Sequence, residues 1–110
     1  MRRVKAFLHD SFRGPVSLNE VALVAGVHPS HVAREFQRMY GMTIGDYIRK
    51  LRVDFVADRL IQPQKDVLSL TDLALGAGFS SHAHMAAMFK RVTGMTPTEY
   101  RKSHGITSIR

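Results

Sequence analysis

The sequence predicts an all-α fold with seven helices in one domain of 110 residues. Three observations predict it. Apolar residues recur at helical spacing along most of the chain, no segment alternates as a strand would, and one part of the sequence repeats another. Because 45% of the residues are hydrophobic, we expect a packed core of modest size rather than disorder.

The internal repeat consists of two matched segments. Residues 17–26 match residues 69–78 at an offset of 52 with six identities, and residues 31–47 match residues 84–100 at an offset of 53 with eight. The second copy therefore carries one extra residue between its matched segments. Glycine and helix-cap positions are repeated together with the apolar ones, so duplication of one structural unit explains the similarity better than chance does.

The first two helices are predicted from an apolar stripe and a cap. The stripe of the first helix, which ends before Gly14 and Pro15, consists of Val4, Phe7, Leu8 and Phe12. Ser17 followed by Glu20 is a capping-box pattern that begins the second helix. Gly26 follows where a helix ends in a residue that tolerates positive φ.

Each copy predicts a further helix after a short turn. In the first copy Pro29 suits the first helical position, with His28 before it. In the second copy Ser80 and Ser81 are both plausible caps. The core stripes of these two helices are Val32 with Phe36 and Met85 with Phe89.

The spacing in each copy is that of a helix-turn-helix. Small residues at 22 and 74 allow two helices to cross steeply, and glycine follows each of them four residues later. Ser69 with Asp72 is a shorter version of the first capping pattern. The apolar residues behind the two caps are Leu18, Val21, Ala22 and Ala25, and Leu70, Leu73, Ala74 and Ala77.

A long helix from about Thr43 to Ile61 is predicted between the copies, with Thr43 and Asp46 as its cap. At ~1.5 Å per residue this helix is about 28 Å long, and it ends at Gln62-Pro63-Gln64. Its apolar residues, predicted along one face, are Ile44, Ile48, Leu51, Phe55 and Leu60.

The last helix opens at residues 96–99, where a threonine cap, a proline and an acid stand in their preferred places. The predicted architecture is thus two helix-turn-helix subdomains joined by a long central helix, in a homeodomain-like arrangement. Its expected boundaries are residues 3–42, the linker helix 43–61, residues 66–103 and a tail at 104–110 that frays.

The charge of the chain indicates a polyanionic partner. Sixteen Lys and Arg residues against nine Asp and Glu residues give a net charge of +7. There is no cysteine, no phosphate-binding glycine loop and no nucleophile motif, so we expect no cofactor and no catalysis. The six histidines do not form a metal-ligand pattern, since His28 and His31 lack a neighbouring acid or cysteine and His82 and His84 do not share a helical face.

Nothing in the sequence indicates a membrane protein. No stretch approaches ~18 consecutive apolar residues, and the basic residues are spread over several helices instead of forming one basic amphipathic helix. The basic start at residues 1–3 is followed by no apolar run of signal-peptide length. These observations fit a protein of the reducing cytoplasm.

The second helix of a helix-turn-helix lies in the major groove of DNA. A central helix of about 28 Å is comparable to the ~34 Å repeat of B-DNA. We therefore expect one monomer to place two recognition helices in successive major grooves, over an asymmetric site of about two helical turns.

The chain resembles the AraC/XylS family of transcription regulators over residues 4–103. The resemblance is carried by LALGAGFSS at residues 73–81, by FKRVTGMTPTEYR at residues 89–101 and by SHVAREF at residues 30–36. It implies a transcription regulator at the bacterial nucleoid, with double-stranded operator DNA as partner and RNA polymerase as a further one. The base-reading positions that it implies are Ser30, Ala33, Arg34, His82, Ala83, His84 and Ala87. The phosphate-binding positions that it implies are His31, Arg38, Lys90 and Arg91.

The chemistry of these residues supports an unequal division of work. Arg34 can bind guanine O6 and N7 with two hydrogen bonds, whereas alanine offers only a methyl contact that suits thymine. Residues 82–88 depart from the family, which usually has an aromatic residue at 85 and a larger polar or basic residue at 87. We therefore expect the first recognition helix to carry most of the specificity.

Each position also has a structural interpretation. Arg34 is also compatible with a solvated surface site, and Ala87 with packing, although a base contact is the favoured interpretation of Arg34. His31 and His84 occupy equivalent positions of the repeat, which favours a shared structural or phosphate-binding role over sequence recognition.

Two wider alternatives remain open at this point. A helical protein-interaction module would have the same fold, and the salt dependence of binding separates it from a DNA-binding protein. Regulators of this family usually carry a separate sensing or dimerisation domain. We expect the chain to be a fragment of such a protein rather than a short stand-alone regulator, and to be monomeric in isolation.

Overall fold

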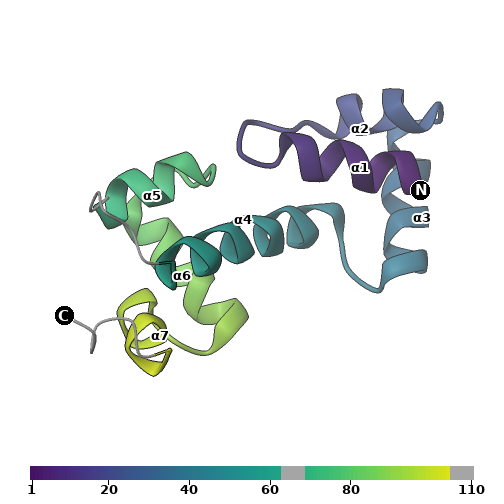
Figure 1. Cartoon of the computed structure of the whole chain (residues 1–110). Helices are drawn as coiled ribbons and strands as arrows, with labels where there is room; N and C mark the ends of the chain where they lie inside the picture. Colours follow the sequence, from purple (N-terminus) through teal and green to yellow (C-terminus); the bar gives the residue numbers. More distant parts are fainter. Residues whose placement is uncertain (63–68, 105–110) are drawn as a thin grey trace. The chain divides into compact units, whose positions relative to one another are not determined.

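The computed structural model describes residues 1–62 and 69–104. Within these ranges it contains helices and no strand, as Figure 1 shows, which confirms the all-α prediction. The helices are α1 (Arg2–Ser11), α2 (Leu18–Ala25), α3 (Pro29–Tyr40), α4 (Ile44–Leu60), α5 (Leu70–Gly76), α6 (His82–Thr93) and α7 (Pro97–Ser103). The predicted helix end at residues 63–64 and the predicted fraying of residues 105–110 lie outside the described residues.

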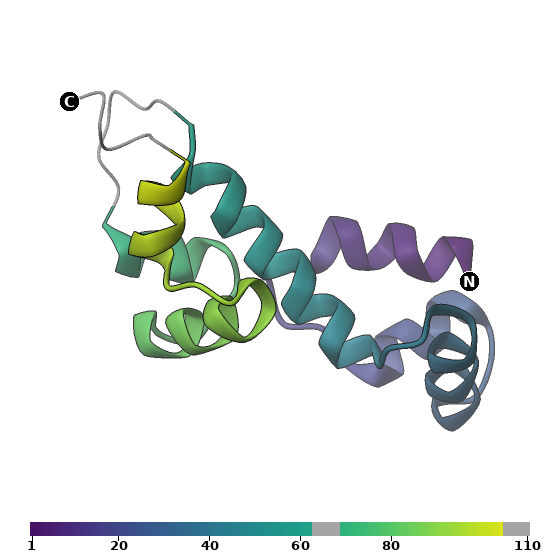
Figure 2. The ribbon, with the colours of Figure 1, turned by 90° about the horizontal axis from the view of Figure 1, so that it is seen from below.

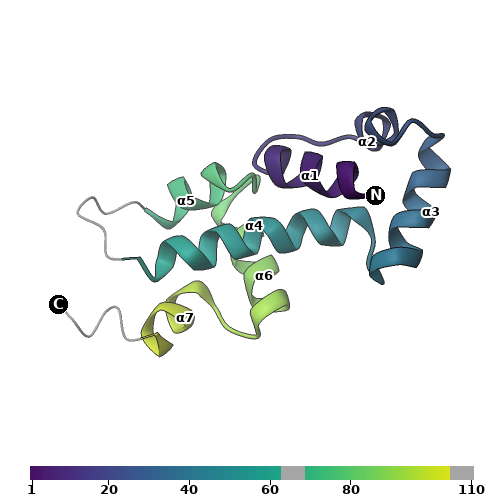
Figure 3. The ribbon, with the colours of Figure 1, turned by 45° about the vertical axis from the view of Figure 1, so that its right-hand side comes forward.

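The chain separates into two compact units, Met1–Leu51 and Arg52–Arg110. In the first unit, α1, α2, α3 and the start of α4 enclose one core, and α3 crosses α1 steeply (Figures 1 and 3). The buried residues are Val4, Leu8, Val21, Ala22, Val32, Phe36, Ile44, Ile48 and Leu51. The stripes predicted for α1 and α3 are thus confirmed. Leu18 is an exception at 42% exposure, because it lies at the open first turn of α2.

In the second unit, α5, α6 and α7 gather around the C-terminal part of α4 (Figure 2). The buried residues are Val53, Val56, Ala57, Leu60, Leu73, Ala74, Ala77, Phe79, Met85 and Phe89. The repeat preserves one aromatic pair in both cores. The ring of Tyr47 meets Phe36 edge-on at 5.4 Å between centroids, and Tyr100 meets Phe89 in the same way at 5.2 Å.

The apolar surface of α4 does not follow one face, so that prediction was wrong. Ile48 and Leu51 belong to the first core, whereas Val53 and Val56 belong to the second. Positions 51 and 53 are two residues apart, and on a helix of 3.6 residues per turn two such positions lie on nearly opposite sides. The buried residues of α4 therefore do not continue on the same face of the helix from the first core to the second.

The helix starts follow the predicted caps. Ser17 with Glu20 forms a complete capping box, and so does Thr96 with Glu99. Ser81 is the cap of α6, because its hydroxyl accepts the backbone N–H of His84 at 3.0 Å. The simpler caps of α4 and α5 are formed by the hydroxyls of Thr43 and Ser69.

The two helix-turn-helix turns share a start and differ afterwards. Gly26 and Gly78 both have positive φ, at 72° and 103°, so the chain leaves α2 and α5 in a similar way. The next residue is Val27 in one turn and Phe79 in the other. Val27 is 39% exposed, whereas Phe79 is buried at 3% exposure. The longer turn of the second unit is therefore anchored in its core.

Candidate nucleic-acid interface

The exposed face of α3 carries the residues predicted to contact bases. Ser30 and Arg34 are exposed and Ala33 is half-buried. Gln37 is also exposed, and its spacing of three and seven residues from Arg34 and Ser30 places it on the same face. Gln37 was not among the predicted positions, although its helical spacing from Ser30, Ala33 and Arg34 was a sufficient signal. The face therefore offers three side chains that form hydrogen bonds.

The corresponding face of α6 consists mainly of alanine. Ala83 and Ala87 are exposed, Ala86 is half-buried, and Lys90 ends the row in the position equivalent to Gln37. Alanine has no hydrogen-bonding group in its side chain, so this face can offer bases only methyl contacts until Lys90. His82 is exposed at the first position of α6 and adds one polar group at the edge.

The histidine at position 84 is engaged with its own helix start. Its ring Nδ1 lies 3.2 Å from the hydroxyl of Ser80, and its ring meets the edge of Phe79 at 5.4 Å between centroids. His31, at the equivalent position of α3, is exposed. These contacts hold the ring of His84, which is also exposed, against the start of its own helix.

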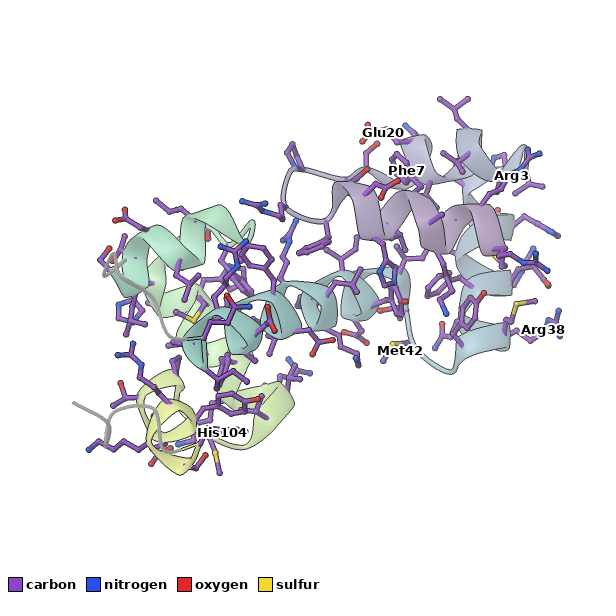
Figure 4. All side chains as sticks on the ribbon, viewed as in Figure 1. Arg3, Phe7, Glu20, Arg38, Met42 and His104 are labelled. Atoms are coloured by element: carbon purple, nitrogen blue, oxygen red, sulfur yellow. The ribbon has the colours of Figure 1, made fainter. Side chains whose placement is uncertain are left out.

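Arg38, a predicted phosphate contact, forms a two-pronged ion pair with Glu35. Its Nη2 lies 2.7 Å from one carboxylate oxygen and its Nε lies 3.2 Å from the other. The hydrogen bond from Arg38 lowers the pKa of Glu35, and the same bond raises the pKa of Arg38. Figure 4 shows Arg38 projecting outward from α3. A phosphate would have to compete with this carboxylate for the guanidinium group.

The second unit has no carboxylate at the equivalent place. Arg91 corresponds to Arg38 in the repeat, and the position corresponding to Glu35 is Met88. Both Arg91 and Lys90 are exposed. Arg91 is therefore better placed to attract a phosphate than Arg38 is.

The cap of α3 is a histidine. The Nδ1 atom of His28 accepts the backbone N–H of Ser30 at 3.2 Å and lies 2.9 Å from the Ser30 hydroxyl. His28 was predicted to precede the helix but not to cap it, because the usual caps are serine, threonine, aspartate and asparagine.

In the parts of the chain that the structure describes, no group of three or more histidine, cysteine, aspartate or glutamate side chains is placed to hold a metal ion. Over the same residues, no helix combines the length and the apolar character needed to cross a membrane.

Residues 21–103 match the family model described as a helix-turn-helix domain. The chain is 31% identical to the HTH-type transcriptional activator AarP of Providencia stuartii, over 91% of this chain and 72% of AarP. It is 30% identical to the melibiose operon regulatory protein of Escherichia coli, over 87% of this chain and 31% of that protein. The chain spans about a third to a half of the length of some curated relatives.

Solved structures share the fold. An AraC-type transcriptional regulator from Chromobacterium violaceum superposes with a TM-score of 0.84 at 24% identity, over 94% of this chain and 90% of the other. The DNA-binding domain of AdpA, a global transcriptional factor solved in complex with a target DNA, superposes with a TM-score of 0.77 at 23% identity, over 92% and 88% of the two chains.

Proposed function

This chain belongs to the AraC-type helix-turn-helix family of DNA-binding transcription regulators, and on that premise we propose that it recognises an operator through two unequal recognition helices. In this proposal α3 and α6 enter successive major grooves of one DNA duplex. The protein binds as a monomer over an asymmetric site of about two helical turns, and it acts by binding rather than by catalysis.

The main support for the proposal is the set of side chains on the exposed face of α3. Arg34 and Gln37 lie on one side of the helix, away from the buried Val32 and Phe36, and can reach base edges from there. Arginine pairs with the O6 and N7 atoms of guanine, and glutamine pairs with the N6 and N7 atoms of adenine. A face with both groups is suited to recognising sequence and not only to holding the phosphate backbone.

The role of α6 is mainly to hold the DNA. Its alanine face offers bases little beyond methyl contacts, whereas Lys90 and Arg91 are exposed cations at its C-terminal part. Cations that neutralise phosphates supply affinity without sequence preference. We therefore propose His31, Arg38, Lys90 and Arg91 as phosphate contacts, with Arg38 the weakest of the three strong cations because Glu35 holds it.

Selection of bound sites from random DNA tests the proposal. We expect a motif with two elements about one helical turn apart, in which the element bound by α3 has the stronger base preferences. A motif of equal strength in both elements would contradict the division of roles. The absence of any enriched motif at low salt would overturn sequence-specific binding altogether.

Salt dependence separates this function from a protein-interaction module of the same fold. Three cations that neutralise phosphates give a slope of about −3 when the logarithm of the binding constant is plotted against the logarithm of salt concentration. A module that binds only protein should show at most the weak affinity of a basic protein for DNA, equal for all sequences. The proposal also includes a contact with RNA polymerase. Membership of the family is its only support.

A further inference from the structure

The contact between His28 and Ser30 fixes the direction of a hydrogen bond. The backbone N–H of Ser30 can only donate, and its acceptor is Nδ1 of His28 at 3.2 Å. Nδ1 is therefore unprotonated in this arrangement, and the ring hydrogen is on Nε2. The hydroxyl of Ser30 lies 2.9 Å from the same unprotonated nitrogen. Nδ1 has one lone pair, which the backbone N–H and the closer hydroxyl share as two donors, so the hydroxyl directs its single hydrogen towards His28.

Once its hydrogen is held by His28, the Ser30 oxygen can only accept a bond from an outside partner. Ser30 is exposed on the same face of α3 as Arg34 and Gln37. In the major groove, adenine and cytosine present amino groups that donate, whereas guanine and thymine present carbonyl oxygens that accept. A hydroxyl that only accepts can therefore distinguish these two pairs of bases, which a freely rotating hydroxyl cannot.

We propose that His28 is a positioning residue for base recognition. By holding the hydroxyl hydrogen, it makes Ser30 select adenine or cytosine over guanine or thymine on the contacted DNA strand. The inference rests on the proposed function, because it requires α3 to lie in the major groove.

The second unit provides an internal comparison. Its helix α6 is capped by the hydroxyl of Ser81, which accepts the backbone N–H of His84. The position equivalent to Ser30 is Ala83, which has no hydroxyl to orient. The recognition helix of the second unit is thus capped by serine and not by histidine. The histidine cap occurs in the copy where a serine hydroxyl stands two residues further on.

The test measures base preference in the wild-type chain and in variants of the contact. Ser30→Ala first identifies the base pair concerned, as the position of the selected motif whose information content falls. Competition binding with all four base pairs at that position then gives the preference. We expect the wild type to favour adenine or cytosine by about 2- to 10-fold, the range for one hydrogen bond.

Two substitutions of His28 separate the proposed role from simple helix capping. In His28→Asn the side-chain oxygen still caps α3 and still accepts the Ser30 hydrogen, so the preference should remain. In His28→Ser the cap also remains, but a hydroxyl can donate as well as accept, so the direction is no longer fixed. The preference should then fall below about 2-fold, while helix content stays that of the wild type.

A matched control uses the second unit. Ser81→His places the same cap on α6, where Ala83 offers no hydroxyl, so base preferences should not change. The inference is overturned if the wild type selects a motif in which Ser30→Ala alters no position. It is also overturned if guanine or thymine is preferred there, or if His28→Ser keeps the wild-type preference. If the wild type selects no motif at all, the proposed function itself fails.

Discussion

The exposed faces of α3 and α6 occupy the same places in two copies of one unit, yet their chemistry differs. At four repeat-related positions α3 has Ser30, Ala33, Arg34 and Gln37, and α6 has Ala83, Ala86, Ala87 and Lys90. The cores have diverged much less, since each keeps a buried phenylalanine against a tyrosine ring. The exposed face of each helix can therefore change in sequence without a change in core packing, because the two depend on different residues of the same helix.

The largest effect on stability should come from removing the buried phenylalanine that both cores contain. Phe36 and Phe89 are both fully buried. Phe36→Ala and Phe89→Ala should each lower the free energy of unfolding by about 3–5 kcal/mol, because each leaves a cavity in a small core. Urea denaturation followed by circular dichroism measures this. Leu23→Ala is the control, since Leu23 is 81% exposed and its removal should change stability by no more than about 0.5 kcal/mol.

The next effect concerns the difference between the two faces. Arg34→Ala should remove about 1–3 kcal/mol of discrimination in favour of guanine at one position of the site. Ala87→Arg places the same side chain at the equivalent position of α6 and should create a new guanine preference in the other half of the site. Binding to a panel of single-base variants measures both.

The histidines of α6 serve as the comparison for Arg34. His82→Ala and His84→Ala should each cost less discrimination than Arg34→Ala, because the ring of His84 is already in contact with Ser80 and Phe79. Equal losses for all three variants would show that α6 recognises sequence as strongly as α3 does.

A smaller effect should distinguish the two equivalent arginines. Arg91→Ala should weaken binding uniformly across sequences and reduce the salt slope by about 1. Arg38→Ala should do so less, because Glu35 competes for its guanidinium group. Glu35→Gln should therefore increase affinity for DNA of any sequence, and Met88→Gln, at the equivalent place, should not. Titrations at several salt concentrations measure these effects. If Arg38→Ala and Arg91→Ala reduced the affinity and the salt slope equally while Glu35 is present, the expected competition would be contradicted.

The smallest effect is a loss of stability at acid pH, which arises at the start of α7. Hydrogen bonds from the backbone and hydroxyl of Thr96 lower the pKa of Glu99. A carboxyl whose pKa is lower in the folded state stabilises the fold above its unfolded pKa, and this contribution is lost as pH falls. The thermal midpoint of the wild type should exceed that of Glu99→Gln at neutral pH. The two should converge as the pH falls through the lowered folded-state pKa of Glu99, and a constant difference would contradict this origin.

Much of the fold was accessible from local patterns. The capping serines and threonines, the apolar stripes of α1, α3 and α6, and the exposed positions of the recognition helices each depend on residues close together in sequence. The repeat supplied the long-range information, because it showed that one unit had to form twice. It also indicated that the two units would not be equal.

The remaining features depend on neighbours that a local pattern does not reveal. The buried residues of α4 do not continue on the same face from Leu51 to Val53, since the two parts of the helix serve different cores. A histidine is an uncommon cap, so the role of His28 required the position of its ring nitrogen. The Glu35–Arg38 pair is predictable from its spacing of three residues, but the geometry of its two hydrogen bonds is not.

The alanine face of α6 has a consequence for how such a regulator changes over generations. Alanine is the best helix former, so α6 keeps its conformation without help from the side chains that face outward. Substitutions at Ala83 or Ala87 remove no hydrogen bond and no buried contact, since both residues are exposed. Folding therefore constrains the residues at these two positions only weakly. Under the proposed function, α6 can therefore acquire a new base preference one residue at a time without loss of its fold.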